Sequence, residues 1–262
     1  MRRPLPALLA CCLALGLFGF GAYEAAEQPT NQIFGATLAQ GPSNQRVVAL
    51  TFDDGPNPPY TDRILHVLEQ EHVKATFFVV GRAVDAYPGV VRREVRDGDA
   101  LGNHSWSHGH FLVMTRSQVR NSLERTDAAI YRATGKHTRL MRPPYGKRDW
   151  LVMQAAEGLG YTVVMWDVPL ARDWEDPPAP VIAQRILSNV TDGSIIVLHD
   201  GNQGELCARE RLSASVCDRR SDIEATRLIV QRLKNRGYRF VTIPQLAALR
   251  HPPMRTSVRP AE

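Results

Sequence analysis

The chain has 262 residues, of which 44% are hydrophobic and 23% charged, and a formal net charge of +5. This length suits one barrel-sized domain or two small ones, and the composition is ordinary for a soluble globular protein. The positive excess is mild and contains no basic block, which argues against a nucleic-acid partner but fits attraction to anionic polymers of a cell envelope.

The N-terminal residues 1–22 predict an export segment. Arg2 and Arg3 form a basic start, and no charged residue occurs from Leu5 to Ala22. A cleaved signal peptide and an uncleaved membrane anchor both fit, because the apolar stretch is near the lower limit of about 18 residues for spanning a bilayer and no clear Ala-x-Ala site follows. We expect an exported protein that is periplasmic, secreted or anchored at the outer face of the cytoplasmic membrane, with membrane attachment through residues 5–22 only.

The remaining chain divides into a linker at 23–45, one domain at 46–250 and a flexible tail at 251–262. Within the domain, strand-like runs occur at residues 47–52, 75–80, 100–103, 139–142, 161–166, 194–199 and 238–242. Helix-like runs lie at residues 61–71, 84–96, 116–134, 150–159, 180–190, 223–236 and 244–249. This alternation predicts an α/β fold with a parallel sheet, either closed as a barrel or open and doubly wound.

Polar side chains that can do chemistry follow the carboxyl ends of five predicted strands. In a (β/α) barrel these ends open on one face, and that face carries the active site. The distribution therefore indicates an enzyme. In chain order the groups are Asp53 and Asp54, His104 and His108, Arg142 and Tyr145, Asp173 and Trp174, and His199 with Asp200.

The first two groups predict a metal site. Asp53 and Asp54 end a buried strand, where their charges repel, and a metal ion would resolve the repulsion with one carboxylate as ligand and the other as base. His104 and His108 stand at i and i+4, which on a helical turn puts both within reach of one ion, although two surface histidines would show the same spacing. Two histidines and one aspartate leave open positions on a divalent ion, as catalytic sites do. Zinc is the default for histidine ligands, and cobalt, nickel, iron or manganese also fit.

Three further positions have both a structural and a functional interpretation. Arg142 begins a turn stiffened by two prolines, and it can pair with the free aspartate while the backbone after it aims an N–H group at an oxyanion. His199 is either a satisfied core histidine or a general acid. Trp166 and Trp174 are either core aromatics or a stacking wall for a sugar ring.

Two of the four cysteines, Cys207 and Cys217, lie in the expected mature chain. An even pair in an exported protein predicts a disulfide, and the alternative is two free surface thiols.

Taken in order, these motifs resemble those of the polysaccharide deacetylases of carbohydrate esterase family four, the NodB-homology domain. The likeness covers residues 46–249, and the matching segments are Thr51–Pro56, His104–His108, Arg142–Tyr145, Asp173–Trp174 and Leu198–His199. The resemblance implies a distorted (β/α) barrel with about seven parallel strands in a single domain. It also implies a metal-dependent N- or O-deacetylase. We expect a monomeric hydrolase of linear amides that removes acetyl groups from N-acetylglucosamine-type polysaccharide or peptidoglycan.

The resemblance assigns a role to each of the side chains already singled out. It makes Asp53 the catalytic base and His199 the acid, with the base oriented by Arg142, an oxyanion donor at the backbone N–H of Tyr145, and the charged network tethered by Asp173. It makes the metal ligands Asp54, His104 and His108, and it forms the substrate pocket from Trp174, Val197 and Leu198.

The chain departs from the family pattern at three places. Leu170 stands where the fourth motif usually has an aspartate, and Val197 stands where the fifth motif usually has leucine. The segment at residues 202–220 is longer than the one we expect after the fifth motif. This last stretch holds the cysteine pair, so we expect a disulfide-pinned loop that shapes the cleft. A hydrolase of non-sugar amides or O-acetyl esters, and a non-catalytic glycan-binding protein, are the alternative functions.

Overall fold

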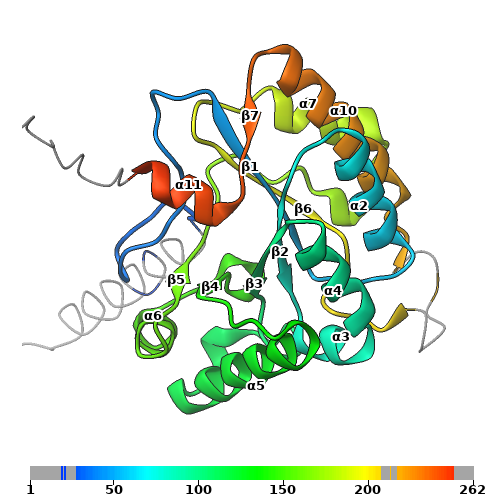
Figure 1. The fold of residues 1–262 in the computed structure, drawn as a ribbon. Coiled ribbons are helices and arrows are strands. Elements are labelled where there is room, and N and C mark those ends of the chain that lie inside the picture. Colours follow the sequence, from blue (N-terminus) through cyan, green and yellow to red (C-terminus); the bar gives the residue numbers. More distant parts are fainter. Residues whose placement is uncertain (1–18, 20, 22–27, 208–212, 214–216, 251–262) are drawn as a thin grey trace, which may run out of the picture.

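A computed structural model gives the fold of residues 19, 21, 28–207, 213 and 217–250, and only these are described (Figure 1). Almost all of the expected export segment and the whole expected tail lie outside the described residues. Within the part that is described, no helix is both long enough and apolar enough to cross a membrane.

Strands and helices alternate along the chain, as the sequence pattern predicts. The strands are β1 (Val47–Asp53), β2 (Thr76–Val79), β3 (Ala100–Asn103), β4 (Leu140–Met141), β5 (Thr162–Val163), β6 (Ile195–His199) and β7 (Arg239–Phe240). The helices are α2 (Tyr60–Gln70), α3 (Gly81–Ala86), α4 (Pro88–Arg96), α5 (Arg116–Thr134), α6 (Trp150–Glu157), α7 (Ala179–Leu187), α10 (Arg220–Asn235) and α11 (Ile243–Arg250). Three short 3-10 turns are η1 (Phe111–Val113), η2 (Pro144–Gly146) and η3 (Asp173–Glu175).

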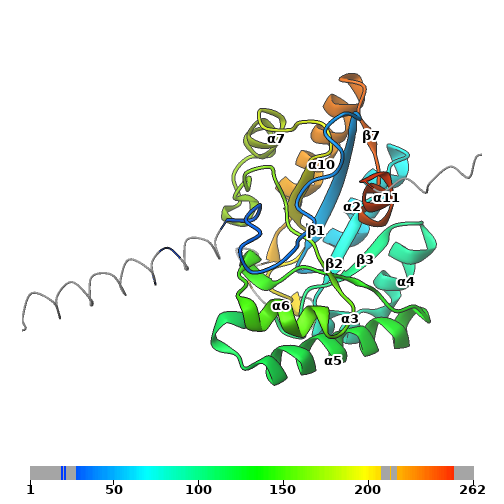
Figure 2. The ribbon, with the colours of Figure 1, turned by 90° about the vertical axis from the view of Figure 1, so that its left-hand side faces the viewer.

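The strands form one curled parallel sheet in the order β5-β4-β3-β2-β1-β6, with β7 paired to the start of β1. Figures 1 and 2 show the helices wrapped around the outside of this sheet. The helices between successive strands return the chain so that the next strand runs in the same direction, as parallel pairing requires. The expected α/β fold, a distorted (β/α) barrel in one domain, is therefore confirmed.

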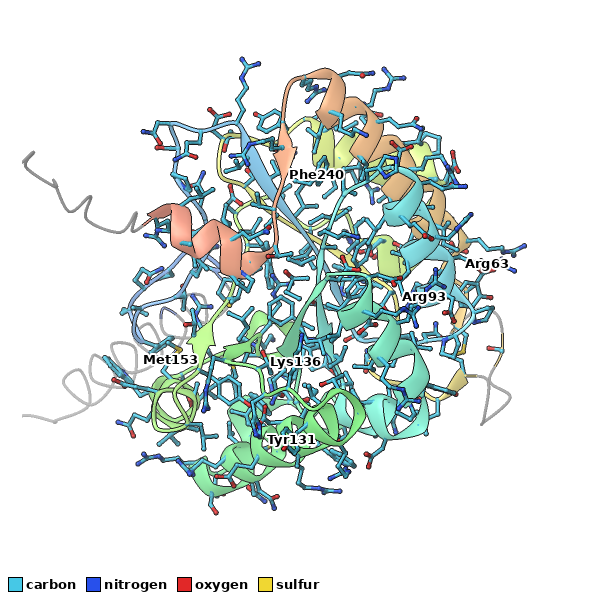
Figure 3. The ribbon with its side chains drawn as sticks, viewed as in Figure 1. Arg63, Arg93, Tyr131, Lys136, Met153 and Phe240 are labelled. Carbon is cyan, nitrogen blue, oxygen red and sulfur yellow. A yellow bond between two sulfur atoms is a disulfide. The ribbon has the colours of Figure 1, made fainter. Side chains whose placement is uncertain are left out.

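The central strands β1, β2 and β6 are almost entirely buried, which explains why their sequences are largely apolar. All seven residues of β1 are buried. Because side chains alternate along a strand, Val48, Leu50 and Phe52 pack in a cluster with the helices α2 and α10, while Val47 and Ala49 pack in a second cluster. Helix α2 shows the matching helical pattern, with Ile64, Leu65 and Leu68 buried and Arg63 at the surface (Figure 3).

The expected helix at 84–96 is in fact two helices, α3 and α4. They meet at Tyr87 and Pro88, and Pro88 is the first residue of α4. Proline has no N–H to donate and is well accommodated in the first turn, so a new helix begins there.

The expected linker at 23–45 contributes to the sheet. The N–H of Leu38 donates to the carbonyl of Val163 at 2.8 Å, and Leu38 accepts from the N–H of Met165 at 2.8 Å. Gln40 forms an antiparallel bridge with Ser194, which precedes β6. The segment thus joins the two ends of the curled sheet, β5 and β6, and Leu38 and Ala39 are buried there. The fold therefore begins before residue 46.

Candidate active site

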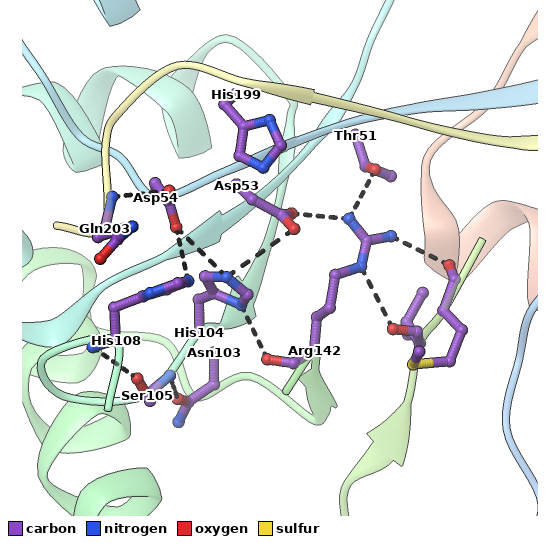
Figure 4. Close-up of polar contacts among 12 residues, drawn as sticks. Thr51, Asp53, Asp54, Asn103, His104, Ser105, His108, Arg142, His199 and Gln203 are labelled. Carbon is purple, nitrogen blue, oxygen red and sulfur yellow. Dashed lines mark hydrogen bonds and ion pairs between the residues drawn. The ribbon is translucent and has the colours of Figure 1, made fainter. Parts of the chain in front are cut away.

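A cavity of about 540 Å³ opens beyond the carboxyl ends of β1, β3 and β6. It brings together side chains that lie far apart in sequence, and Figure 4 shows the polar contacts among the central ones. The residues that line it include Asp53, Asp54, His104, His108, Tyr145, Trp166, Leu170, Trp174, Val197, His199 and Gln203.

Three buried side chains fit a divalent metal ion. Oδ1 of Asp54 lies 3.1 Å from Nε2 of His108 and 3.4 Å from Nε2 of His104. One atom from each of the three residues lies within 4.8 Å of the others. Among the described residues, Oδ1 of Asp54 has no hydrogen-bond partner. A buried carboxylate oxygen that faces two imidazole nitrogens and is otherwise unsatisfied has the surroundings of a metal ligand.

The two histidines are brought together by a turn after β3 rather than by a helix. Oδ1 of Asn103 accepts the N–H of Ser105 at 3.0 Å, and Oγ of Ser105 accepts the N–H of His108 at 2.9 Å. Nδ1 of His104 lies 2.8 Å from the carbonyl of Arg142, which leaves its Nε2 free to face the cavity. Burial lowers the pKa of His108 to about 4, against the opposing effect of Asp54, so this imidazole is neutral near pH 7 and able to coordinate.

Asp53 is held by a buried arginine. Nη1 of Arg142 donates to Oδ1 of Asp53 at 2.7 Å and to Oγ1 of Thr51 at 2.8 Å. The rest of the guanidinium donates to the carbonyls of Val164 and Met165. Arg142 is fully buried, and its satisfied donors make this burial tolerable. The other oxygen, Oδ2 of Asp53, lies 3.9 Å from Nε2 of His104, so Asp53 stands beside the three candidate ligands.

His199 forms an ion pair with Asp173. Its Nδ1 lies 3.0 Å from Oδ2 of Asp173, and its main-chain N–H donates to the same oxygen at 2.7 Å. Burial lowers the pKa of His199, but Asp173 and, less strongly, Asp54 and Asp53 raise it, with a net value of about 10. The imidazole is therefore protonated near neutral pH, with 15% of its side chain exposed to the cavity.

A third carboxyl group, which the sequence pattern did not identify, extends this pair. Asp222, in the first turn of α10, is buried and hydrogen-bonds with Asp173. Burial and the neighbouring Asp173 raise the pKa of Asp222 well above its usual range, so it is the protonated partner. An acidic residue at a helix start looks like an ordinary favourable charge next to the helix dipole, which is why the pattern did not reveal it.

Two aromatic side chains border the cavity mouth. Tyr145 has φ of +59° inside η2, and its ring packs edge-on against His108 with centroids 4.5 Å apart. Trp174 is 43% exposed and packs edge-on against His199 with centroids 5.5 Å apart. The two rings thus stand beside the candidate metal ligands and beside His199.

The structure corrects one expected pocket residue. Val197 lines the cavity, but Leu198 belongs to the cluster beneath the helices. Successive residues of a strand point to opposite faces, so these two neighbours in β6 cannot both face the cavity. Leu170, which stands in place of an expected aspartate, lines the cavity as an apolar side chain.

Cys207 and Cys217 form the expected disulfide, with their Cα atoms 5.8 Å apart. The loop that precedes Cys207 brings Gln203 into the site. The main-chain N–H of Gln203 donates to Oδ2 of Asp54 at 2.7 Å, and Oε1 of Gln203 accepts from the Tyr145 hydroxyl at 3.3 Å. A main-chain contact of this kind does not depend on the side chain, so the sequence cannot predict it.

Comparisons with known proteins identify a matching family and similar chains. A sequence model of the family described as polysaccharide deacetylase matches residues 40–164. The peptidoglycan-N-acetylglucosamine deacetylase PgdA of Listeria monocytogenes is 36% identical over 204 residues, which are 78% of this chain. The chain spans only 39% of the length of that relative.

Two solved structures share the fold. The Bc1960 peptidoglycan N-acetylglucosamine deacetylase is 32% identical with a TM-score of 0.71, over 80% of this chain and 92% of that one. BA3943 of Bacillus anthracis, described as a pseudoenzyme of carbohydrate esterase family four, is 28% identical with a TM-score of 0.72, over 82% of this chain and 69% of that one. Because a pseudoenzyme shares the fold, the fold alone does not establish activity, which depends on the residues of the site.

Proposed function

Because the chain belongs to the polysaccharide deacetylase family, we propose that it is a metal-dependent hydrolase that removes acetyl groups from N-acetylglucosamine-type glycans. The relatives named peptidoglycan and chitooligosaccharide deacetylases support this substrate class. The expected export segment and the cell-wall substrates in those names support an exported enzyme that acts outside the cytoplasmic membrane.

Asp54, His104 and His108 would hold the ion, and zinc is the metal we favour because two of its three ligands are imidazoles. A divalent ion supplies Lewis acidity there, which polarises a carbonyl and acidifies water. The hydrogen bond from His104 to the carbonyl of Arg142 fixes the ring so that Nε2 faces Asp54 and would be available to bind the ion.

Asp53 is the general base in this proposal. It lies beside the ligand set, and Arg142 donates a hydrogen bond to its Oδ1, which orients the carboxylate. Asp53 takes a proton from water as the new C–O bond forms at the acetyl carbon. The backbone N–H of Tyr145 is the proposed donor to the developing oxyanion, and loss of one such donor costs about 3 kcal/mol of barrier.

His199 is the general acid. Its pKa of about 10 keeps it protonated at neutral pH, and Asp173 fixes its ring through Nδ1, so Nε2 is the atom that can deliver a proton. It protonates the amide nitrogen as the C–N bond breaks, and acetate and an amino sugar leave. Trp174, half-exposed beside His199, offers an apolar face to the sugar ring.

One observation supports this function above all: a carboxylate held by Arg142 and a protonated His199 both line the cavity that holds the three candidate metal ligands. This is the arrangement that amide hydrolysis needs, with base and acid both in place.

The test is acetate release by the zinc-loaded full chain from a panel of glycans. N-acetylated chitooligosaccharides and peptidoglycan fragments should release acetate, and O-acetylated xylan and a non-sugar N-acetyl amide should release much less. Release only from the last two would favour the alternative hydrolases. No release from any substrate by protein that binds zinc would favour the non-catalytic glycan-binding alternative.

A further inference from the structure

The two oxygens of the Asp54 carboxylate have different surroundings. Oδ1 faces both histidines and lacks a hydrogen-bond partner among the described residues, whereas Oδ2 accepts the main-chain N–H of Gln203 at 2.7 Å. Figure 4 shows this contact on the side of Asp54 away from Asp53. A carboxylate with one oxygen held in this way can turn only one oxygen toward an ion, so the contact orients the ligand.

The segment that contains Gln203 is held in place by Arg82 at the start of α3 and by Val80 just before this helix. Nε of Arg82, in α3, donates to the carbonyl of Gly204 at 2.9 Å, and its guanidinium lies 3.2 Å from Glu205. Gly204 has φ of +70° and packs against Val80, where a Cβ would come within 2.4 Å of a Val80 methyl carbon. The chain can therefore approach the end of β2 only with glycine at this position.

The two ends of the loop are fastened as well. Nε of the buried Arg219 donates to the carbonyl of Gly201 at 2.7 Å. Nδ2 of Asn57 donates to the carbonyl of Cys217 at 3.1 Å, and Cys217 is bonded to Cys207. Gln203 thus lies in a segment fixed on both sides, although its own φ is an unfavourable +51°.

We propose that Gln203 and Arg82 are positioning residues for the metal ligand Asp54, and that the Arg82 contact with the loop raises the affinity of the site for its ion. Arg82 acts through the loop, since it touches Gly204 and Glu205 rather than the ligands. The inference rests on the proposed metal site, but it concerns affinity and not turnover.

The experiment measures zinc affinity of the full chain by competition with a chromophoric chelator. Arg82→Ala should weaken zinc binding by about tenfold, the lower end of the range for partners that orient a metal ligand. Gly204→Ala should weaken it as well, because alanine at this φ has to move the loop away from Val80. Arg132→Ala is the matched control. Arg132 lies in α5 and contacts Asp85 of α3, the helix that carries Arg82, at 2.7 Å. Its removal takes away an arginine contact to α3 without touching the loop, so zinc affinity should not change.

Circular dichroism checks that each variant is folded, and Gly204→Ala decides the question if Arg82→Ala does not fold. Wild-type affinity in folded Arg82→Ala and Gly204→Ala would overturn the inference. Equal weakening by Arg132→Ala would also overturn it, since the effect would then come from α3 in general. A wild-type protein that binds no zinc would instead refute the metal site itself, so the two failures are distinguishable.

Discussion

Replacing Asp173 with asparagine should change how the stability of the protein depends on pH. The substitution preserves the side-chain shape and one acceptor for the main-chain N–H of His199, but it removes the charge that faces Nδ1 at 3.0 Å. Burial still lowers the pKa of His199, and its largest opposing interaction is gone. The pKa of His199 should therefore fall from about 10 to near or below 6.5.

The sign and size of the effect follow from linkage. The folded state of the wild type binds the His199 proton more tightly than the unfolded state, so the stabilisation is complete below pH 6.5 and is lost as the pH rises toward 10. Each pH unit between those values is worth about 1.4 kcal/mol, which gives at most about 5 kcal/mol in total. Between pH 6.5 and pH 9 the wild type should lose about 3 kcal/mol of unfolding free energy through this group.

Urea unfolding at pH 6.5, 7.5 and 9, with chelator present so that no ion alters the site, gives the three free energies. The difference in unfolding free energy between the wild type and Asp173→Asn should shrink by about 3 kcal/mol from pH 6.5 to pH 9. Asp222→Asn is the control, because it removes the titrating acid but keeps a hydrogen-bond donor for Asp173. The fall in unfolding free energy with rising pH that His199 causes should therefore persist in this variant. A wild-type-to-Asp173→Asn difference that stays constant with pH would refute the ion-pair reasoning.

Three other substitutions test separate parts of the protein. Asp53→Asn should keep zinc affinity and lower kcat by about 10²–10⁴-fold, whereas His104→Ala should lose both zinc binding and activity. Calorimetric zinc titration measures the first property and acetate release the second. Loss of zinc binding in Asp53→Asn would contradict the assignment of Asp53 as the base. Glu94→Gln should stabilise the fold by about 1–3 kcal/mol at pH 8 and less at pH 4. The reason is that the carboxyl oxygens of buried Glu94 have no hydrogen-bond partner among the described residues, and burial raises its pKa well above 4.5. Keeping Glu94 protonated in the folded state therefore costs more free energy as the pH rises. An equal change in the urea-unfolding free energy at both pH values would count against this reasoning. Trp174→Ala should raise KM severalfold with little change in Tm, because the ring is 43% exposed, and a large fall in Tm with unchanged KM would show that Trp174 only packs.

The sequence determined the order of strands and helices because periodicity is a local property. β3 and α5 begin and end where the pattern predicts, and the apolar runs at 47–52 and 194–199 are the buried β1 and β6. The same order explains why the candidate site could be assembled from the sequence: parallel strands place all their carboxyl ends on one face, so residues after β1, β3 and β6 had to meet. The resemblance then divided Asp53 and Asp54 into base and ligand, which charge and spacing alone had left open.

The three-dimensional structure was needed to show which distant segments complete that arrangement. Residues 38–40 join β5 to β6, Asp222 supports Asp173, and Gln203 holds Asp54, yet each of these segments looks like an ordinary linker, helix start or loop in the sequence. The location of Leu198 in the core was likewise not predictable from the sequence, because only the sheet shows which face of β6 lines the cavity. Periodicity records whether a side chain is buried, but the partner across the fold is fixed by how the sheet curls and where the loops return, and main-chain contacts such as that of Gln203 are independent of side-chain identity.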